Sequence, residues 1–145
     1  MNKTDSASRL LRLVLLIVLV LMSGASLSGQ SGSSASPPRG AILVTNNLDL
    51  DFSKHKVTFI ELGADRCIPC RAMQPIMKEI AEEFAGKILV VFYDVWKDPA
   101  PARKYGIQLI PTQVFIDASG TEIFRHVGFF AKEEMLQMLK EKGVL

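Results

Sequence analysis

Apolar and polar residues are arranged along the chain in blocks whose period changes between that of a strand and that of a helix. Short runs rich in β-branched and aromatic residues, bounded by turn residues, predict buried strands. We expect five strands, at residues 41–45, 57–62, 88–93, 112–117 and 122–127. The last two are separated by Ala118-Ser119-Gly120, which predicts a hairpin turn.

Apolar residues that recur at three- and four-residue steps predict helices. We expect them at residues 67–84, around 102–105 and at 132–142. Pro75 lies inside the first helix, where we expect a kink, and residues 46–56 fit a helix or a loop. The order of elements predicts a right-handed βαβ crossover followed by a hairpin and a closing helix. The fold class is therefore α/β, a three-layer sandwich with a central mixed sheet and helices on both faces.

A dense apolar run, residues 13–22, stands near the start of the chain, after three basic residues and before the small residues 23–26. This pattern is typical of a secretory signal. The run is shorter than the roughly 20 apolar residues of a membrane span, but residues 10–27 together give a marginal span. A cleaved signal, a retained membrane anchor and a buried helix of the domain all stay open. No cysteine follows the run, which excludes lipid attachment there.

The stretch after this run is rich in serine, glycine and proline and cannot bury enough apolar surface to order itself. We therefore expect a signal peptide or N-terminal anchor at residues 1–26, a flexible linker at 27–40 and one folded domain at 41–145. This organisation predicts an extracytoplasmic protein, periplasmic or secreted, that a retained segment 10–27 would tether to the membrane.

The length of 145 residues leaves room for one ordinary domain. The formal net charge of +2 arises in the first 26 residues, because the rest has 14 basic and 14 acidic residues. A nucleic-acid partner would need a basic patch, so we expect none. We expect a monomer.

The chain has only two cysteines, Cys67 and Cys70, separated by two residues. A disulfide between them closes almost no loop and would stabilise the fold little. The pair could be half of a zinc site completed by His55 or His126, although neither histidine belongs to a pair with ligand spacing. An inert surface disulfide is a second alternative. The strand–helix context favours a third, redox chemistry.

The cysteines stand where a predicted strand gives way to a predicted helix. Free backbone N–H groups and the helix dipole at that point favour a thiolate at Cys67. Arg66 and Arg71 add positive potential, and Pro69 suits the first turn of a helix. An exposed thiolate with a second thiol one turn away is what thiol–disulfide exchange requires.

From about Val57 to the C-terminus the chain resembles the thioredoxin family. The matches, in chain order, are Cys67 and Cys70 with Pro69 before the second cysteine, Lys104-Tyr105-Gly106-Ile107, Ile110-Pro111-Thr112, and Gly128. The resemblance implies a thioredoxin-like sandwich in which Cys67 is the nucleophile and Cys70 the resolving thiol. It also implies a cis bond before Pro111, a bond that is uncommon in proteins, although a trans turn is the alternative.

The resemblance further implies a substrate-binding surface around the cysteines. Its expected members are Arg66, Ile68, Pro69, Ile110, Pro111 and Gly128. Family members commonly have a buried acid in the strand before the cysteines, and Glu61 stands there between two apolar residues. We expect Glu61 to be buried, with a raised pKa, and to exchange a proton with Cys70. The alternative is a glutamate that faces solvent.

Three positions depart from the usual pattern of the family. Arg66 replaces a tryptophan, Ile68 replaces a glycine, and Phe92 replaces a lysine that often neighbours the buried acid. Arg66 should favour the thiolate and make the pair more oxidising. Ile68 enlarges the apolar surface around the site. The first helix of the domain looks short or missing between Thr45 and Lys56.

These features predict a disulfide oxidoreductase of exported proteins. We expect a reductase, because Ile-Pro-Thr resembles thioredoxin more than the disulfide-forming enzymes, with a membrane or periplasmic electron donor and no cofactor or metal. The alternative is a non-catalytic binding module or assembly factor. Trp96 and Phe129-Phe130 fit either a substrate-facing patch or packing, and the two histidines fit surface or strand positions better than catalytic ones.

Overall fold

The computed structural model describes residues 38–145. The expected signal or anchor at residues 1–26 and most of the expected linker lie outside the described residues. Within residues 38–145, no helix combines the length and the apolar character that crossing a membrane requires.

The described chain forms a five-stranded sheet with helices on both faces. The elements, in chain order, are β1 (Leu43–Val44), the 3₁₀ helix η1 (Phe52–Lys54), β2 (Val57–Gly63), α2 (Ile68–Glu83), β3 (Ile88–Asp94), α3 (Ala100–Lys104), β4 (Thr112–Asp117), β5 (Glu122–Val127) and α4 (Lys132–Glu141). The strand order is β1-β3-β2-β4-β5. β1, β3 and β2 are parallel, and β4 runs antiparallel to both β2 and β5.

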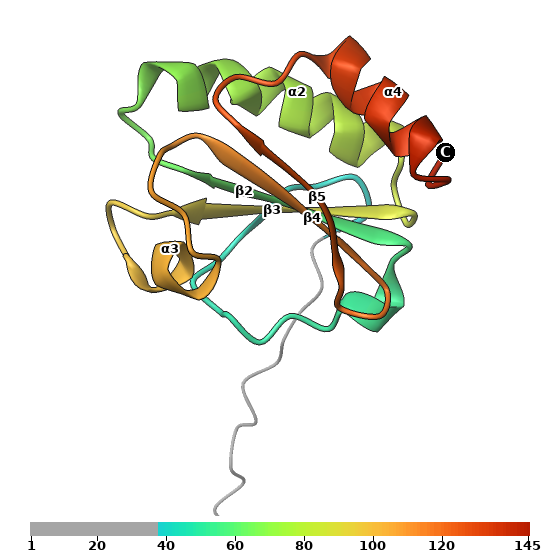
Figure 1. Cartoon of the computed structure of the whole chain (residues 1–145), viewed down its shortest axis with the longest axis horizontal. Coiled ribbons are helices and arrows are strands. Elements are labelled where there is room, and N and C mark those ends of the chain that lie inside the picture. Colours follow the sequence, from blue (N-terminus) through green and yellow to red (C-terminus); the bar gives the residue numbers. More distant parts are fainter. Residues whose placement is uncertain (1–37) are drawn as a thin grey trace, which may run out of the picture. The chain divides into compact units, whose positions relative to one another are not determined.

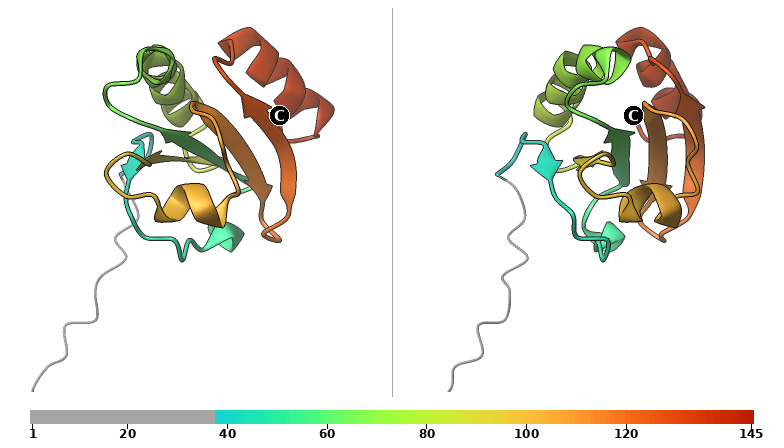
Figure 2. Two further views of the ribbon diagram at one scale, coloured as in Figure 1. Left: turned by 60° about the vertical axis from the view of Figure 1, so that its left-hand side comes forward. Right: turned by 90° about the vertical axis from the view of Figure 1, so that its left-hand side faces the viewer.

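The layers follow the expected α/β sandwich. Figure 1 shows α2 and α4 side by side over one face of the sheet, and α3 below the other face. Figure 2 shows the same layers from two further sides, with η1 on the face that carries α3. The mixed sheet with helices on both faces is therefore confirmed.

Most predicted elements are present, with shifted ends. β4 and β5 have the expected bounds, whereas β1 has only two residues and α3 begins at Ala100. This start lies two residues before the expected helix, because proline is well tolerated in the first turn of a helix. β2 extends to Gly63, one residue beyond the expected end of this strand. Between Thr45 and Lys56 the only helical element is η1, in agreement with the expectation that the first helix of the domain is short or missing there.

Two apolar layers cover the central strands. Phe59 of β2 packs with the α2 and α4 layer and stacks on Phe115 with ring centroids 4.8 Å apart. Ile60, the next residue along β2, points to the opposite layer with Tyr93 and Val114. Each large apolar side chain buried in this way contributes roughly 1.5–3 kcal/mol. The packing holds β2 and β3 firmly in register, so their carboxyl ends form a rigid edge where α2 begins.

Candidate active site

Cys67 is the residue that caps the N-terminus of α2. Its backbone is extended, with φ −79° and ψ 118°, and its Sγ accepts a hydrogen bond from the backbone N–H of Cys70 at 3.3 Å. The helix therefore begins at Ile68, one residue later than expected, because Cys67 takes the cap conformation. In the reduced protein the same N–H can stabilise a thiolate at Cys67.

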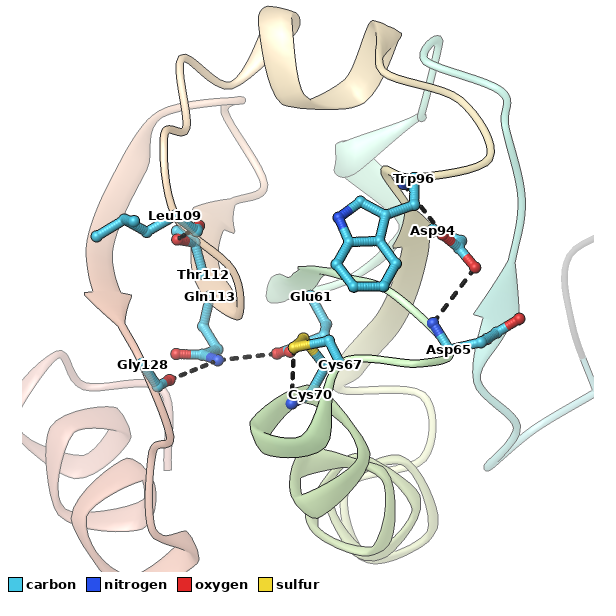
Figure 3. The surroundings of a disulfide bond; sticks show 10 residues. All are labelled: Glu61, Asp65, Cys67, Cys70, Asp94, Trp96, Leu109, Thr112, Gln113 and Gly128. Atoms are coloured by element: carbon cyan, nitrogen blue, oxygen red, sulfur yellow. Dashed lines mark hydrogen bonds between the residues drawn. A yellow bond between two sulfur atoms is a disulfide. The ribbon is translucent and has the colours of Figure 1, made fainter.

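The two sulfurs form a disulfide and differ in exposure. Cys67 is 8% exposed and Cys70 is 0% exposed, so only Cys67 can be reached from solvent. This difference agrees with the roles that the resemblance implies, with Cys67 as the attacking sulfur and Cys70 as the sulfur behind it. Figure 3 shows the disulfide at the tip of α2, facing β4 and the loop that precedes it.

Gly63 leaves the space that Cys70 occupies. A Cβ at this position would lie 3.2 Å from Cys70 Cβ, 3.2 Å from Phe92 Cε2 and 3.4 Å from Cys70 Sγ. Such contacts are closer than ordinary van der Waals packing, so the glycine lets the backbone of β2 approach the second cysteine. Gly63 is a site residue that the sequence analysis missed, and only its place before the cysteines could have indicated it.

The loop before β4 lies against the cysteines. The Ile110–Pro111 peptide is cis, as the resemblance implies. Ile110 packs against the small buried cluster of Ala64, Cys67 and Cys70. The backbone N–H of Gly128 donates to Pro111 O at 2.8 Å, which places the end of β5 beside this loop. The structure thus brings Ile110, Pro111 and Gly128 together at the disulfide.

Glu61 is buried behind the cysteine pair. It lies two residues before Gly63 on the same face of β2, is 0% exposed, and extends toward the disulfide in Figure 3. Burial raises the pKa of its carboxyl from the ordinary 4.5 to about 8, although a hydrogen bond from Gln113 Nε2 to Glu61 Oε2 at 3.0 Å acts in the opposite direction. The predicted burial is confirmed, and the solvent-facing alternative is wrong.

The comparisons with known proteins agree with this geometry. A family model described as thioredoxin matches residues 41–141. The chain belongs to the thioredoxin family. Thioredoxins of Staphylococcus aureus strains Mu50 and MW2 are each 30% identical over 100 residues, covering 68% of this chain and 95% of theirs. With its disulfide-bonded Cys67 and Cys70, this thioredoxin-family protein is a thiol–disulfide oxidoreductase.

A solved structure supports the fold. A mutant thioredoxin from Halobacterium salinarum NRC-1 superposes with a TM-score of 0.64 at 24% identity, covering 74% of this chain and 95% of that one. At this identity the likeness concerns the fold alone.

Several apolar side chains of the thioredoxin domain, at the start of α2, after β3 and before β4, are exposed to solvent. Ile68 is 82% exposed, Trp96 is 63% exposed and Leu109 is 67% exposed. Phe129 is also exposed at 49%, whereas Phe130 is 4% exposed and packs in the core. Of the two alternatives left open by the sequence, packing is therefore the one that holds for Phe130, whose ring contacts those of Phe115 and Phe124. Arg66 and Pro69 are exposed next to the disulfide, and their predicted contact with substrate stays a prediction.

Asp94 holds the loop that carries Trp96. One of its carboxylate oxygens accepts from the backbone N–H groups of Trp96 and Lys97 at 3.1 and 3.2 Å, and the other accepts from Asp65 at 3.4 Å. Lys97 forms ion pairs with both aspartates. These residues and Arg66 line a hollow of about 380 Å³. The sequence analysis did not identify Asp94. The only signal for it in the sequence is an acidic residue directly after a predicted buried strand.

The two histidines lie away from the sulfurs. His126 on β5 stacks on Phe130 with ring centroids 4.2 Å apart, and its Nε2 lies 3.1 Å from Phe129 O. His55 follows η1, at the other end of β2 from the cysteines. In residues 38–145, no group of three or more histidine, cysteine, aspartate or glutamate side chains is arranged to hold a metal ion.

Proposed function

We propose that this oxidoreductase reduces disulfides in exported proteins, and that a membrane or periplasmic dithiol protein returns it to the reduced state. The N-terminal pattern of basic, apolar and small residues supports export. The thioredoxin-like Ile110-Pro111-Thr112 segment supports reduction. The observation that carries the chemistry is the arrangement of a reachable Cys67 sulfur at a helix N-terminus, with Cys70 and a buried carboxyl behind it.

The exchange proceeds in two steps. The Cys67 thiolate attacks one sulfur of the substrate disulfide, a Cys67–substrate disulfide forms, and the other substrate sulfur leaves as a thiolate. Cys70 then gives its proton to Glu61 and attacks Cys67 Sγ. The second substrate sulfur leaves as a thiolate and takes up a proton from solvent, and Glu61 then releases to solvent the proton that it received from Cys70. The substrate has gained two electrons, and Cys67 and Cys70 have become a disulfide.

Helix geometry supports the first step. The Cys67 sulfur that carries negative charge before attack lies against the N–H of Cys70, at the positive end of a 16-residue helix. Burial supports the second step, because an acid whose pKa is about 8 can both accept and release a proton near neutral pH.

Insulin reduction with dithiothreitol as the electron source tests the activity. Wild-type protein should accelerate the reaction, and both Cys67→Ser and Cys70→Ser should abolish this acceleration. The Cys70→Ser variant should also accumulate mixed disulfides through Cys67. A client interaction that survives both substitutions, with no acceleration by wild type, would instead support the binding module.

The direction of exchange and the compartment need separate measurements. A reductase should have an equilibrium potential near that of thioredoxin, about −270 mV, and a value near −120 mV would indicate an oxidant instead. Export is tested with the full chain in a bacterial host. A maleimide that does not cross the inner membrane should label Cys67 of the Cys70→Ser variant in intact cells; labelling only after lysis would contradict export.

A further inference from the structure

Gln113 is a buried polar residue at the centre of the site with no part in the exchange described so far. It lies in β4, where it pairs directly with Glu61 of β2 on one side and with His126 of β5 on the other. Directly paired residues of antiparallel strands point to the same face of a sheet. Gln113 is 0% exposed, so its amide faces the space behind the disulfide rather than solvent.

The amide of Gln113 bridges two acceptors. Nε2 donates to Glu61 Oε2 at 3.0 Å and to Gly128 O at 3.2 Å, as Figure 3 shows. These two bonds use both hydrogens of the NH₂ group and define its orientation, because the flipped amide would place Oε1 against two acceptors. One side chain thereby connects β2, β4 and the residue that follows β5.

The same arrangement leaves two oxygens without a donor. Glu61 Oε1 and Gln113 Oε1 are both buried and have no hydrogen-bond partner in the described part of the chain. A leucine or methionine would fill this strand position without an unpaired buried oxygen, and burying such a group is costly. Stability alone therefore does not account for an amide here.

We propose that Gln113 is a positioning residue of the exchange reaction, whose amide orients the Glu61 carboxyl toward Cys70 and ties it to the Gly128 carbonyl beside the cis-proline loop. This inference rests on the proposed function, because proton transfer from Cys70 matters only if the cysteines exchange disulfides. Glu61 remains the group that accepts the proton.

The N–H of Gln113 favours the ionised carboxyl. Burial disfavours a negative charge on Glu61, and the bond from Gln113 offsets part of that effect. Without the bond, Glu61 would hold its proton at higher pH and would be a less available base. The link to Gly128, whose own N–H donates to Pro111 O at 2.8 Å, joins the carboxyl to the loops on which a substrate strand would lie.

The test compares Gln113→Met with wild type by following the titration of the Glu61 side-chain carboxyl carbon by ¹³C NMR in the oxidised protein. Gln113→Met retains length and loses both donors. The titration midpoint should rise by roughly one pH unit, as expected for the loss of a charge-assisted hydrogen bond. The rate of insulin reduction at pH 7 should fall about tenfold, and the fall should shrink as the pH is raised.

Two further variants make the result specific. Thr58→Val changes another buried polar residue of β2 and should leave both profiles unchanged. In a Glu61→Gln background, Gln113→Met should no longer shift the pH profile of the rate. If Gln113→Met does not fold, Gln113→Asn, which keeps the amide but shortens its reach, should shift the titration in the same direction.

An unchanged Glu61 midpoint in the folded Gln113 variant would overturn the proposal, as would an equal loss of rate at every pH in both backgrounds. The NMR titration needs no substrate. It therefore decides the role of Gln113 toward Glu61 even if wild-type protein fails to reduce insulin, a result that would count against the proposed function alone.

Discussion

Glu61 on β2 pairs with Phe92 on β3 on one side and with Gln113 on β4 on the other. The two cross-strand neighbours of the buried carboxyl are therefore an aromatic residue and an amide. Neither neighbour carries a positive charge. Burial of the carboxylate is therefore compensated by a single hydrogen bond from an uncharged amide, and the pKa of Glu61 rises to about 8. The departure from the family at Phe92 thus has a direct electrostatic consequence for the acid.

This raised pKa makes the stability of the fold depend on pH. The folded protein keeps the proton of Glu61 up to about pH 8, whereas the unfolded chain releases it near pH 4.5. The free energy of unfolding should therefore decrease by about 1.4 kcal/mol per pH unit between these values, through this group alone. Glu61→Gln removes this pH dependence. The variant should therefore become more stable relative to wild type as the pH rises. Urea unfolding of the oxidised proteins from pH 5 to pH 8 measures it.

The control for this prediction is Glu133→Gln, which changes an exposed glutamate of α4. Its stability relative to wild type should stay nearly constant over the same range. A constant difference for Glu61→Gln as well would mean that Glu61 is ionised in the folded protein.

Gly63→Ala should destabilise the protein and slow disulfide exchange. The added methyl group would press on Cys70 and on the Phe92 ring, at 3.2 Å from each. Overpacking of this kind typically costs about 1–3 kcal/mol. A second substitution, Phe92→Leu, removes the ring atom nearest the methyl group and should recover part of the loss. Thermal unfolding of the single and double variants checks this coupling, and strictly additive effects would contradict it.

Ile68→Ser should weaken substrate binding without affecting the fold. The side chain is 82% exposed next to Cys67, so it contributes little to the core and is free to contact a substrate. We expect KM for a peptide disulfide to rise roughly three- to tenfold with kcat little changed, since apolar contact area is lost on binding. Val44→Ser, at an exposed apolar residue of edge strand β1, is the matched control. An equal effect of both substitutions would show that the contact is not local.

Asp94→Ala should loosen the loop that presents Trp96. The substitution removes the acceptor of three backbone N–H groups, which should cost about 1–3 kcal/mol of stability. Asp65→Ala removes only an exposed ion pair with Lys97 and should cost much less stability, because solvent screens such a pair. Chemical unfolding and limited proteolysis between β3 and α3 compare the two. Equal losses would indicate that Asp94 acts through Lys97 alone.

Local signals in the sequence were sufficient for much of the fold. The hairpin of β4 and β5 was predicted with its observed ends, because a three-residue turn between two short apolar runs is a purely local signal. The cysteine pair was equally evident, since two cysteines separated by two residues at a strand–helix junction need no distant residue to be recognised. The exact start of α2 was missed because the cap conformation of Cys67 depends on the helix that it begins.

The burial of two neighbouring residues of the same type could not be predicted from the sequence. Phe129 and Phe130 are adjacent and identical in type, yet one is exposed and the other is buried against Phe115 and Phe124. The direction in which α4 returns over the sheet determines which of the two rings enters the core. No local pattern at this turn carries that information.

The sequence by itself determined the α/β order of elements, the redox pair and the presence of an acid in the strand before it. Tertiary structure alone decided what surrounds that acid. Glu61 and Gln113 are 52 positions apart, and their contact depends on the register between β2 and β4. A shift of one residue would turn the amide to the other face of the sheet. That register results from packing over both faces of the sheet, which no short stretch of the chain specifies.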